Sequence, residues 1–411
     1  MNLDQQPTKH YDWIDIAQLV ISILAFFQFL SWAGLMGLLA CLGGKSAGLS
    51  LEPSMVINMV LTALLFSVIA LVSIVSTIQK IRGVAKPRGL PRSGALLFSI
   101  LLLVPIFGLA ALAGLASAKV RAIAYAVLAI PAIAIPVFWL LRLGARGQKA
   151  ASPKRESGFL IFSFKISTPY ILIIEMILFI FLGTIFMLSM MGKPEFMELI
   201  SKISANPEWL ASDPSRLFTE YQSLFHLPTI IGLVLLTVAG IMPVVEELFK
   251  TIGVWLLKVR NPNPSESFRA GLLCGAGFAL FEGLLSVNSL ALKSIGFSEW
   301  AGLMLGRFGG SLLHILSGGM IGLAIGKFWQ NRKFGSLFLA YLISWSLHAA
   351  WNALAVVGGI NPLLQGKETQ SPLYIVGLVV LFAGMLLIFF RLIAKAARTT
   401  PQMVDSQEAQ A

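Results

Sequence analysis

The amino-acid sequence predicts an all-α fold, a polytopic transmembrane helix bundle of about ten spans. Hydrophobic residues make up 57% of the 411 residues and charged residues only 12%, whereas soluble domains carry about 25% charged residues. The hydrophobic residues fall in long uninterrupted runs, and about 20 such residues form a helix that crosses a bilayer. Lysine and arginine concentrate in every second loop between these runs. Together these observations exclude a water-soluble fold.

Ten apolar runs define the expected spans. Each run is long enough to cross the hydrocarbon core at about 1.5 Å per helical residue. In chain order they cover residues 14–41, 54–78, 94–116, 121–142, 168–191, 228–257, 268–292, 302–326, 335–357 and 373–394.

Loop charge predicts the orientation of these spans. Lysine and arginine concentrate in every second loop, the side that faces the cytoplasm in most membrane proteins. This pattern predicts a multi-pass protein of the cell membrane with both termini in the cytoplasm. It also accounts for the net charge of +12 by contact with an anionic lipid leaflet, so we expect no nucleic-acid partner.

The chain divides into an accessory and a core region in this prediction. Residues 1–150 would form an accessory bundle of four transmembrane helices. The Ser/Pro/charged run that follows predicts a flexible cytoplasmic linker over 151–167. Residues 168–398 would form a six-helix core with an external loop at 192–227, and 399–411 a disordered tail.

Ionisable residues inside apolar spans mark the candidate site. Such groups cost at least a few kcal/mol in the hydrocarbon, so they indicate function or a specific partner. Four successive spans of the core carry them: Glu246, Glu247 and Lys250 in the sixth, Glu282 in the seventh, His314 in the eighth, and His348 with Asn352 in the ninth.

These residues share one predicted depth. Glu246 lies 12 residues before Lys258 and Glu282 lies 13 after Arg269, while His314 and His348 are similarly spaced from basic loop residues. At about 1.5 Å per residue, each group lies roughly 18 to 23 Å from the cytoplasmic edge. The sequence therefore predicts a single buried polar site.

Spacing within each span adds supporting detail. Lys250 lies within side-chain reach of both glutamates on a helix, so it could neutralise one of them. Phe278 and Glu282 share a helix face, as do His348 and Asn352. Pro243 predicts a kink before the glutamates that exposes backbone carbonyls and admits water.

Two hydrolytic chemistries fit this residue set. A buried glutamate could act as the general base that activates water against a peptide carbonyl, with His and Asn stabilising the oxyanion. Alternatively, histidines and a glutamate could hold Zn²⁺ with one open position, although the sequence lacks HExxH. A proton- or cation-coupled transporter would use the same groups, but it predicts inverted repeats, and the polar groups are confined to the second half.

The motifs together resemble the PrsW-type intramembrane proteases, which are related to the CAAX-processing membrane endopeptidases. They stand here as EExxK at Glu246–Lys250, FxxxE at Phe278–Glu282, His314, and HxxxN at His348–Asn352. The resemblance implies an intramembrane endopeptidase in the core region. It implies a membrane protein substrate, such as an anti-sigma factor or another single-span protein.

Each residue has an expected role in that activity. Glu246 or Glu247 would be the general base, Glu282 and His314 would position water or a metal, and His348 with Asn352 would bind the oxyanion. A zinc ion, if present, would be held among Glu247, Glu282, His314 and His348. Lys250 and Phe278 would support the site, and Arg307 is interpreted as structural.

Overall fold

The computed structural model describes residues 13–41, 52–82, 98–148, 153–206, 228–256, 263–288, 292, 295–365 and 373–399. These residues are helical and contain no strand. Among them are nine helices long and apolar enough to cross a membrane, with a shorter apolar helix at Phe98–Gly114. The predicted fold class, a multi-pass helical membrane protein, is confirmed.

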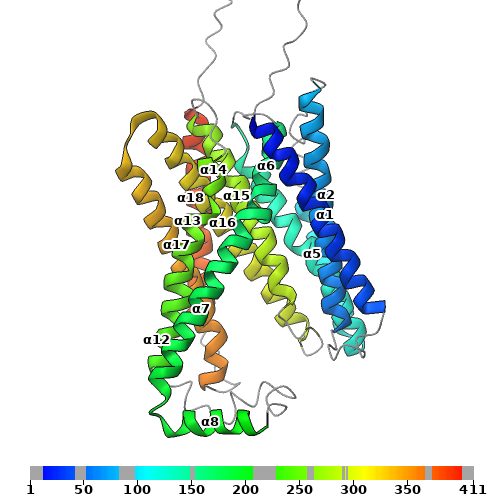
Figure 1. Ribbon diagram of the computed structural model, residues 1–411, viewed down its shortest axis with the longest axis vertical. Coiled ribbons are helices and arrows are strands. Elements are labelled where there is room, and N and C mark those ends of the chain that lie inside the picture. The colour runs from blue at the N-terminus through cyan, green and yellow to red at the C-terminus, as the bar shows by residue number, and fades with distance from the viewer. Residues whose placement is uncertain are drawn as a thin grey trace, which may run out of the picture. The chain divides into compact units, whose positions relative to one another are not determined.

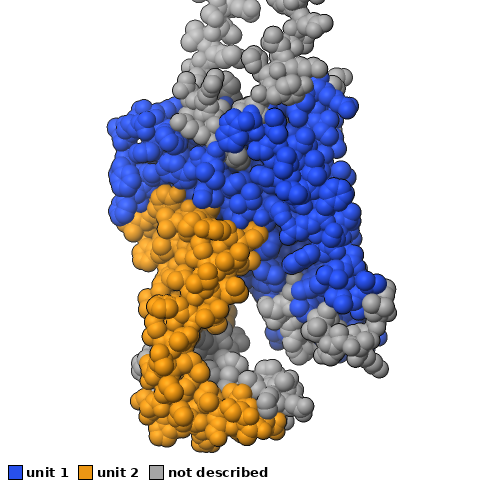
Figure 2. Space-filling model, viewed as in Figure 1, with its two compact units in different colours: residues 1–168, 250–340, 386–411 blue, residues 169–249, 341–385 orange. Residues whose placement is uncertain are grey.

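Two compact units make up the chain, and Figure 2 colours them separately. Unit 1 comprises residues 1–168, 250–340 and 386–411, and unit 2 comprises 169–249 and 341–385. The four N-terminal spans therefore lie in one unit with part of the predicted core. The predicted tail from residue 400 onward and most of the external loop, 207–227, lie outside the described residues.

Unit 1 is organised around one pair of long helices, α15 (Pro264–Asn288) and α16 (Phe297–Asn331). They are the most buried spans, at 78% and 89% of their apolar windows. The close approach of α15 and α16 depends on glycine. A Cβ on Gly271 would overlap the backbone of Gly318, and a Cβ on Gly275 would overlap the backbone of His314. This packing fixes the height of His314 against α15.

The other helices of unit 1 surround this pair. They are α1 (Trp13–Cys41), α2 (Pro53–Ile81), α4 (Leu103–Gly114), α5 (Ala118–Gly144), α6 (Pro153–Phe162) and α14 (Ile252–Leu256). Helices α1 and α2 lie side by side, and α5 packs on both α15 and α16 (Figure 1). Buried Gln18 of α1 donates to Thr77 of α2. Such hydrogen bonds hold polar helix faces together inside a membrane.

The predicted linker differs from the structure. Residues 153–167 are helical, first as α6 and then as the π-helix η2 (Ser163–Ser167), which leads directly into α7. Pro153 suits the first turn of a helix, where no N–H is needed. Glu156 pairs with Arg269 of α15, and Gln18 of α1 donates to Ser157. Tertiary partners thus order a segment whose composition indicated a loop.

Unit 2 contains α7 (Thr168–Met190), α8 (Pro194–Ala205), α12 (Pro228–Val234), the π-helix η3 (Leu235–Ile241), most of α13 (Met242–Lys250), and parts of α17 (Phe334–Gln365) and α18 (Leu373–Arg398). Helix α8 runs across the ends of α7 and α12 (Figure 1). Its Phe196 and Leu199 form an apolar cluster with Met190 and Ile230. The described part of the loop that was predicted to be external therefore contains a docked amphipathic helix.

Both π-helices end two residues before a proline, Pro169 for η2 and Pro243 for η3. Proline lacks the N–H that an α-helix requires, and the wider π turn changes the hydrogen-bond register at that point. The predicted disturbance at Pro243 is thus a π-helical segment. It frees backbone carbonyls directly before the glutamate pair.

Candidate active site

Helix α13 presents two adjacent glutamates. Glu246 and Glu247 lie three and four residues after Pro243, about one helical turn, and five and six residues after the end of the π-helix η3. Their side chains are 12% and 2% exposed, respectively. Two adjacent carboxylates at this depth require partners, because a buried charge is costly unless it is paired.

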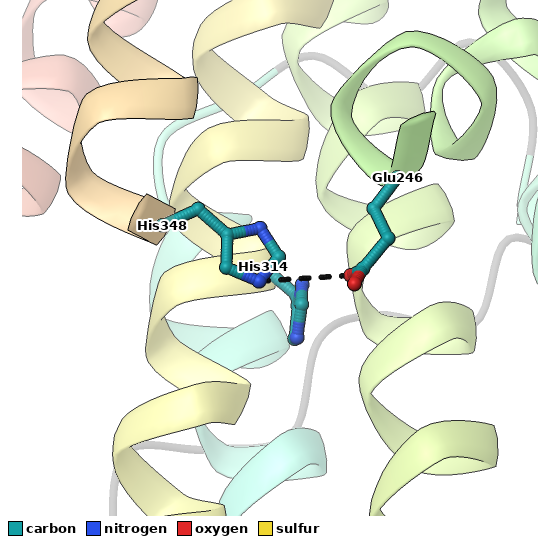
Figure 3. A group of neighbouring side chains, drawn as sticks. All are labelled: Glu246, His314 and His348. Carbon is teal, nitrogen blue, oxygen red and sulfur yellow. Dashed lines mark ion pairs between the residues drawn. The ribbon is translucent and has the colours of Figure 1, made fainter. Parts of the chain in front are cut away.

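His348 of α17 lies between these two carboxylates within unit 2. Its Nδ1 is 2.9 Å from Glu247 Oε1, a hydrogen-bond distance, and its Nε2 is 3.6 Å from Glu246 Oε2. Figure 3 draws the Glu246–His348 pair with a dashed line; His314, also drawn there, belongs to the other unit. A carboxylate accepts hydrogen bonds, so Nδ1 can donate to Glu247, and in the neutral ring the lone pair is then on Nε2.

This geometry fits a metal site. Two ligand atoms at about 2.0–2.2 Å from a tetrahedral zinc ion lie about 3.3–3.6 Å apart. The 3.6 Å separation of Glu246 Oε2 and His348 Nε2 has that size. Metal-binding histidines characteristically donate their other ring N–H to a carboxylate, as Nδ1 can to Glu247.

The π-helix η3 is braced by α17. Asn352 Nδ2 donates to the Val238 carbonyl at 3.0 Å, and Trp345 Nε1 donates to the Gly240 carbonyl at 2.9 Å. Both acceptors belong to the segment that precedes the glutamates. The structure therefore gives the Asn352 amide a second role beside the predicted oxyanion contact, which stays a prediction.

We expect Asn352→Ala to lower the free energy of unfolding by about 0.5–1.5 kcal/mol, the usual net value of one hydrogen bond. The rate constant kcat should fall less than about tenfold, because Trp345 still holds η3. Thermal unfolding and cleavage assays in detergent would measure both. A loss of about 10²–10³-fold in kcat at unchanged stability would instead assign Asn352 to the oxyanion.

A second histidine–carboxylate pair lies within unit 1. His314 Nε2 is 2.9 Å from Glu282 Oε2, and Arg307 NH1 donates to the other oxygen, Oε1, at 2.8 Å. Phe278, one turn before Glu282, packs edge-on against the His314 ring with centroids 4.8 Å apart. The FxxxE motif thus supplies both an apolar and a polar contact to His314.

Lys250 is fully buried at the end of α13. Its ammonium donates to Ser317 Oγ on α16, and the Ser317 hydroxyl lies 3.3 Å from the His314 carbonyl. The structure therefore links Lys250 to the helix that carries His314. The supporting role of Lys250 in the site stays a prediction.

Within the two units, the structure brings the predicted residues into two clusters. Unit 2 holds Glu246, Glu247 and His348 together, with Asn352 one turn along α17. Unit 1 holds Phe278, Glu282 and His314. The sequence interpretation missed the contact of Arg307 with Glu282. An arginine inside an apolar span, seven residues before His314, was the available signal.

Comparison with known families supports this region as the functional part. The model of the PrsW family intramembrane metalloproteases matches residues 216–385. That range contains both clusters. No curated protein and no solved structure matches the chain.

Proposed function

We propose that residues 216–385, which the family model matches, form a PrsW-type intramembrane protease that uses a metal ion to cleave peptide bonds within membrane-embedded proteins. Glu246 and His348, which lie together in unit 2, have the donor chemistry of a metal site and are our proposed ligands, and His314 stays in the ligand set that the sequence predicts. The observation that carries the proposal is the position of His348 between Glu246 and Glu247.

In this proposal, each of the two histidine–carboxylate pairs supports one histidine ligand. Glu247 lies at hydrogen-bond distance from His348 and Glu282 from His314, so each ring has a carboxylate that can hold it in place as a ligand. The proposed ligand set therefore replaces Glu247 and Glu282 of the sequence prediction by Glu246. A metal ion held there would supply a Lewis acid that polarises the scissile carbonyl.

A metal-free alternative uses the same residues. Glu246 would then be the general base that takes a proton from the attacking water, because its Oε2 lies 3.6 Å from His348 Nε2, whereas Glu247 and Glu282 lie at the hydrogen-bond distance of 2.9 Å from their histidines. In both chemistries Glu246 is the carboxylate that takes part directly, either as a metal ligand or as the general base. The family description as metalloproteases favours the metal.

The surroundings of the reaction are also part of the proposal. Substrates of an intramembrane protease are proteins of the bilayer. We propose single-span proteins, such as an anti-sigma factor, cut in a cell membrane by an enzyme whose termini face the cytoplasm. The charge bias of the loops supports that orientation.

Metal removal should abolish cleavage. We expect purified protein in detergent to cut members of a panel of single-span substrates, to lose this activity in 1,10-phenanthroline, and to regain it with Zn²⁺. The non-chelating isomer 1,7-phenanthroline is the control. Activity that survives chelation but is lost in Glu246→Gln would assign the reaction to a glutamate base. Wild-type protein that cuts no substrate would contradict the proposed function.

A further inference from the structure

Arg307 of α16 lies inside an apolar span. A charged side chain there is energetically costly and therefore indicates a function or a specific partner. It precedes His314 by seven residues, or about two helical turns, so the two side chains project from similar faces of α16. Its side chain is 27% exposed. None of the sequence motifs at Glu246–Lys250, Phe278–Glu282, His314 or His348–Asn352 includes it.

One carboxylate connects this arginine to the histidine. Glu282 reaches from α15 and accepts from Arg307 NH1 through Oε1 at 2.8 Å, while its Oε2 lies 2.9 Å from His314 Nε2. Each oxygen therefore has a separate partner on α16. Rotation of the carboxylate in either direction would break one of the two contacts.

This arrangement selects one tautomer of His314. A carboxylate accepts hydrogen bonds, so Nε2 must carry a proton and, in the neutral ring, Nδ1 keeps the lone pair. The edge-on contact with the Phe278 ring restricts other orientations of the His314 ring, and the close approach of Gly275 fixes the position of the His314 backbone. Arg307 holds the Glu282 carboxylate in this position through the hydrogen bond to Oε1.

We infer that Arg307 is a positioning residue of the protease, which holds Glu282 against His314 and so sets which ring nitrogen faces the reaction. The inference rests on the proposed function of His314. The effect of Arg307 on the His314 ring, however, does not require a bound metal ion. It can therefore be tested without an activity assay.

The test is nitrogen-15 NMR of the histidine rings in metal-free protein. The chain has four histidines, and His314→Gln would assign the signal of His314. We expect a single tautomer with the proton on Nε2 in wild type and a mixture of tautomers in Arg307→Met. Arg307→Lys should restore most of the wild-type signal, because the ammonium can still bind Glu282.

Arg269→Met is the matched control. Arg269 also pairs with a glutamate, Glu156, but lies 13 residues from Glu282 on α15, or about 20 Å along the helix. We expect this variant to keep the His314 tautomer. An unchanged tautomer in Arg307→Met, or the same change in Arg269→Met, would overturn the inference.

Metal affinity gives a second readout. Removal of a group that supports a metal ligand typically weakens binding about ten- to a hundredfold, and we expect Co²⁺ titration to show this for Arg307→Met and not for Arg269→Met. If Arg307→Met bound Co²⁺ as tightly as the wild type does, the inference about Arg307 would be wrong and the proposed function would be unaffected. A wild-type protein that neither binds Co²⁺ nor cuts substrate would instead overturn the proposed function, and the inference with it.

Discussion

Replacing Glu246 by glutamine is expected to lower kcat by about 10²–10⁴-fold, the usual contribution of a group that handles the proton of the reaction. The amide keeps the size of the side chain but can neither take a proton nor bind a metal as a carboxylate does. Glu246 Oε2 lies 3.6 Å from His348 Nε2, while Nδ1 of the same ring lies 2.9 Å from Glu247 Oε1. Cleavage of a single-span substrate by purified protein measures the effect.

Glu247→Gln is the neighbouring control. Its amide oxygen can still accept from His348 Nδ1, so the ring stays in place and only the charge is lost. We expect a smaller loss of about ten- to a hundredfold, as for other residues that support a metal ligand. If Glu247→Gln were the more damaging change, the roles of the two glutamates would have to be exchanged.

Gly275→Ala is expected to lower the free energy of unfolding by about 1–3 kcal/mol, the usual cost of overpacking. An added Cβ would overlap the His314 carbonyl oxygen, which is part of the helix backbone and cannot rotate away. Helix α16 would have to move away from α15 to relieve this overlap. Because His314 moves with it, cleavage should fall as well. Thermal unfolding in detergent and the cleavage assay measure the two effects.

Gly310→Ala is the matched control for this variant. Gly310 lies on α16 one turn before His314, and an added Cβ would meet nothing within 4 Å. Alanine is favoured over glycine in a helix interior by about 0.5–1 kcal/mol. We therefore expect unchanged or higher stability with normal cleavage. Equal destabilisation by both substitutions would show that close packing of α15 and α16 is not the cause.

Much of the fold could be predicted from the sequence because bilayer thickness sets the length of each apolar run. The structure confirms a multi-pass helical protein. Among the described residues, nine helices qualify as candidate spans, and the span predicted at 94–116 is the shorter apolar helix Phe98–Gly114. A second difference is the run at 153–167, where charged residues indicated a linker. Its helix depends on partners such as Arg269, which lies more than 100 residues away in the chain.

The candidate residues could also be predicted, because a buried Glu or His is costly and stands out in an apolar span. Their pairing could not. Which oxygen of Glu246 or Glu247 meets which nitrogen of His348 depends on the rotation of α13 and α17 about their axes. Neighbouring helices set that rotation, and the π-helix before Pro243 alters it further.

The sequence by itself therefore determined the membrane-spanning architecture and the identity of the residues available for chemistry, since both follow from the cost of polar groups in hydrocarbon. Only the tertiary structure decided their partners. It joined Glu247 to His348, Glu282 to His314 and Arg307 to Glu282, because hydrogen bonds between helices depend on helix packing rather than on spacing along one chain segment.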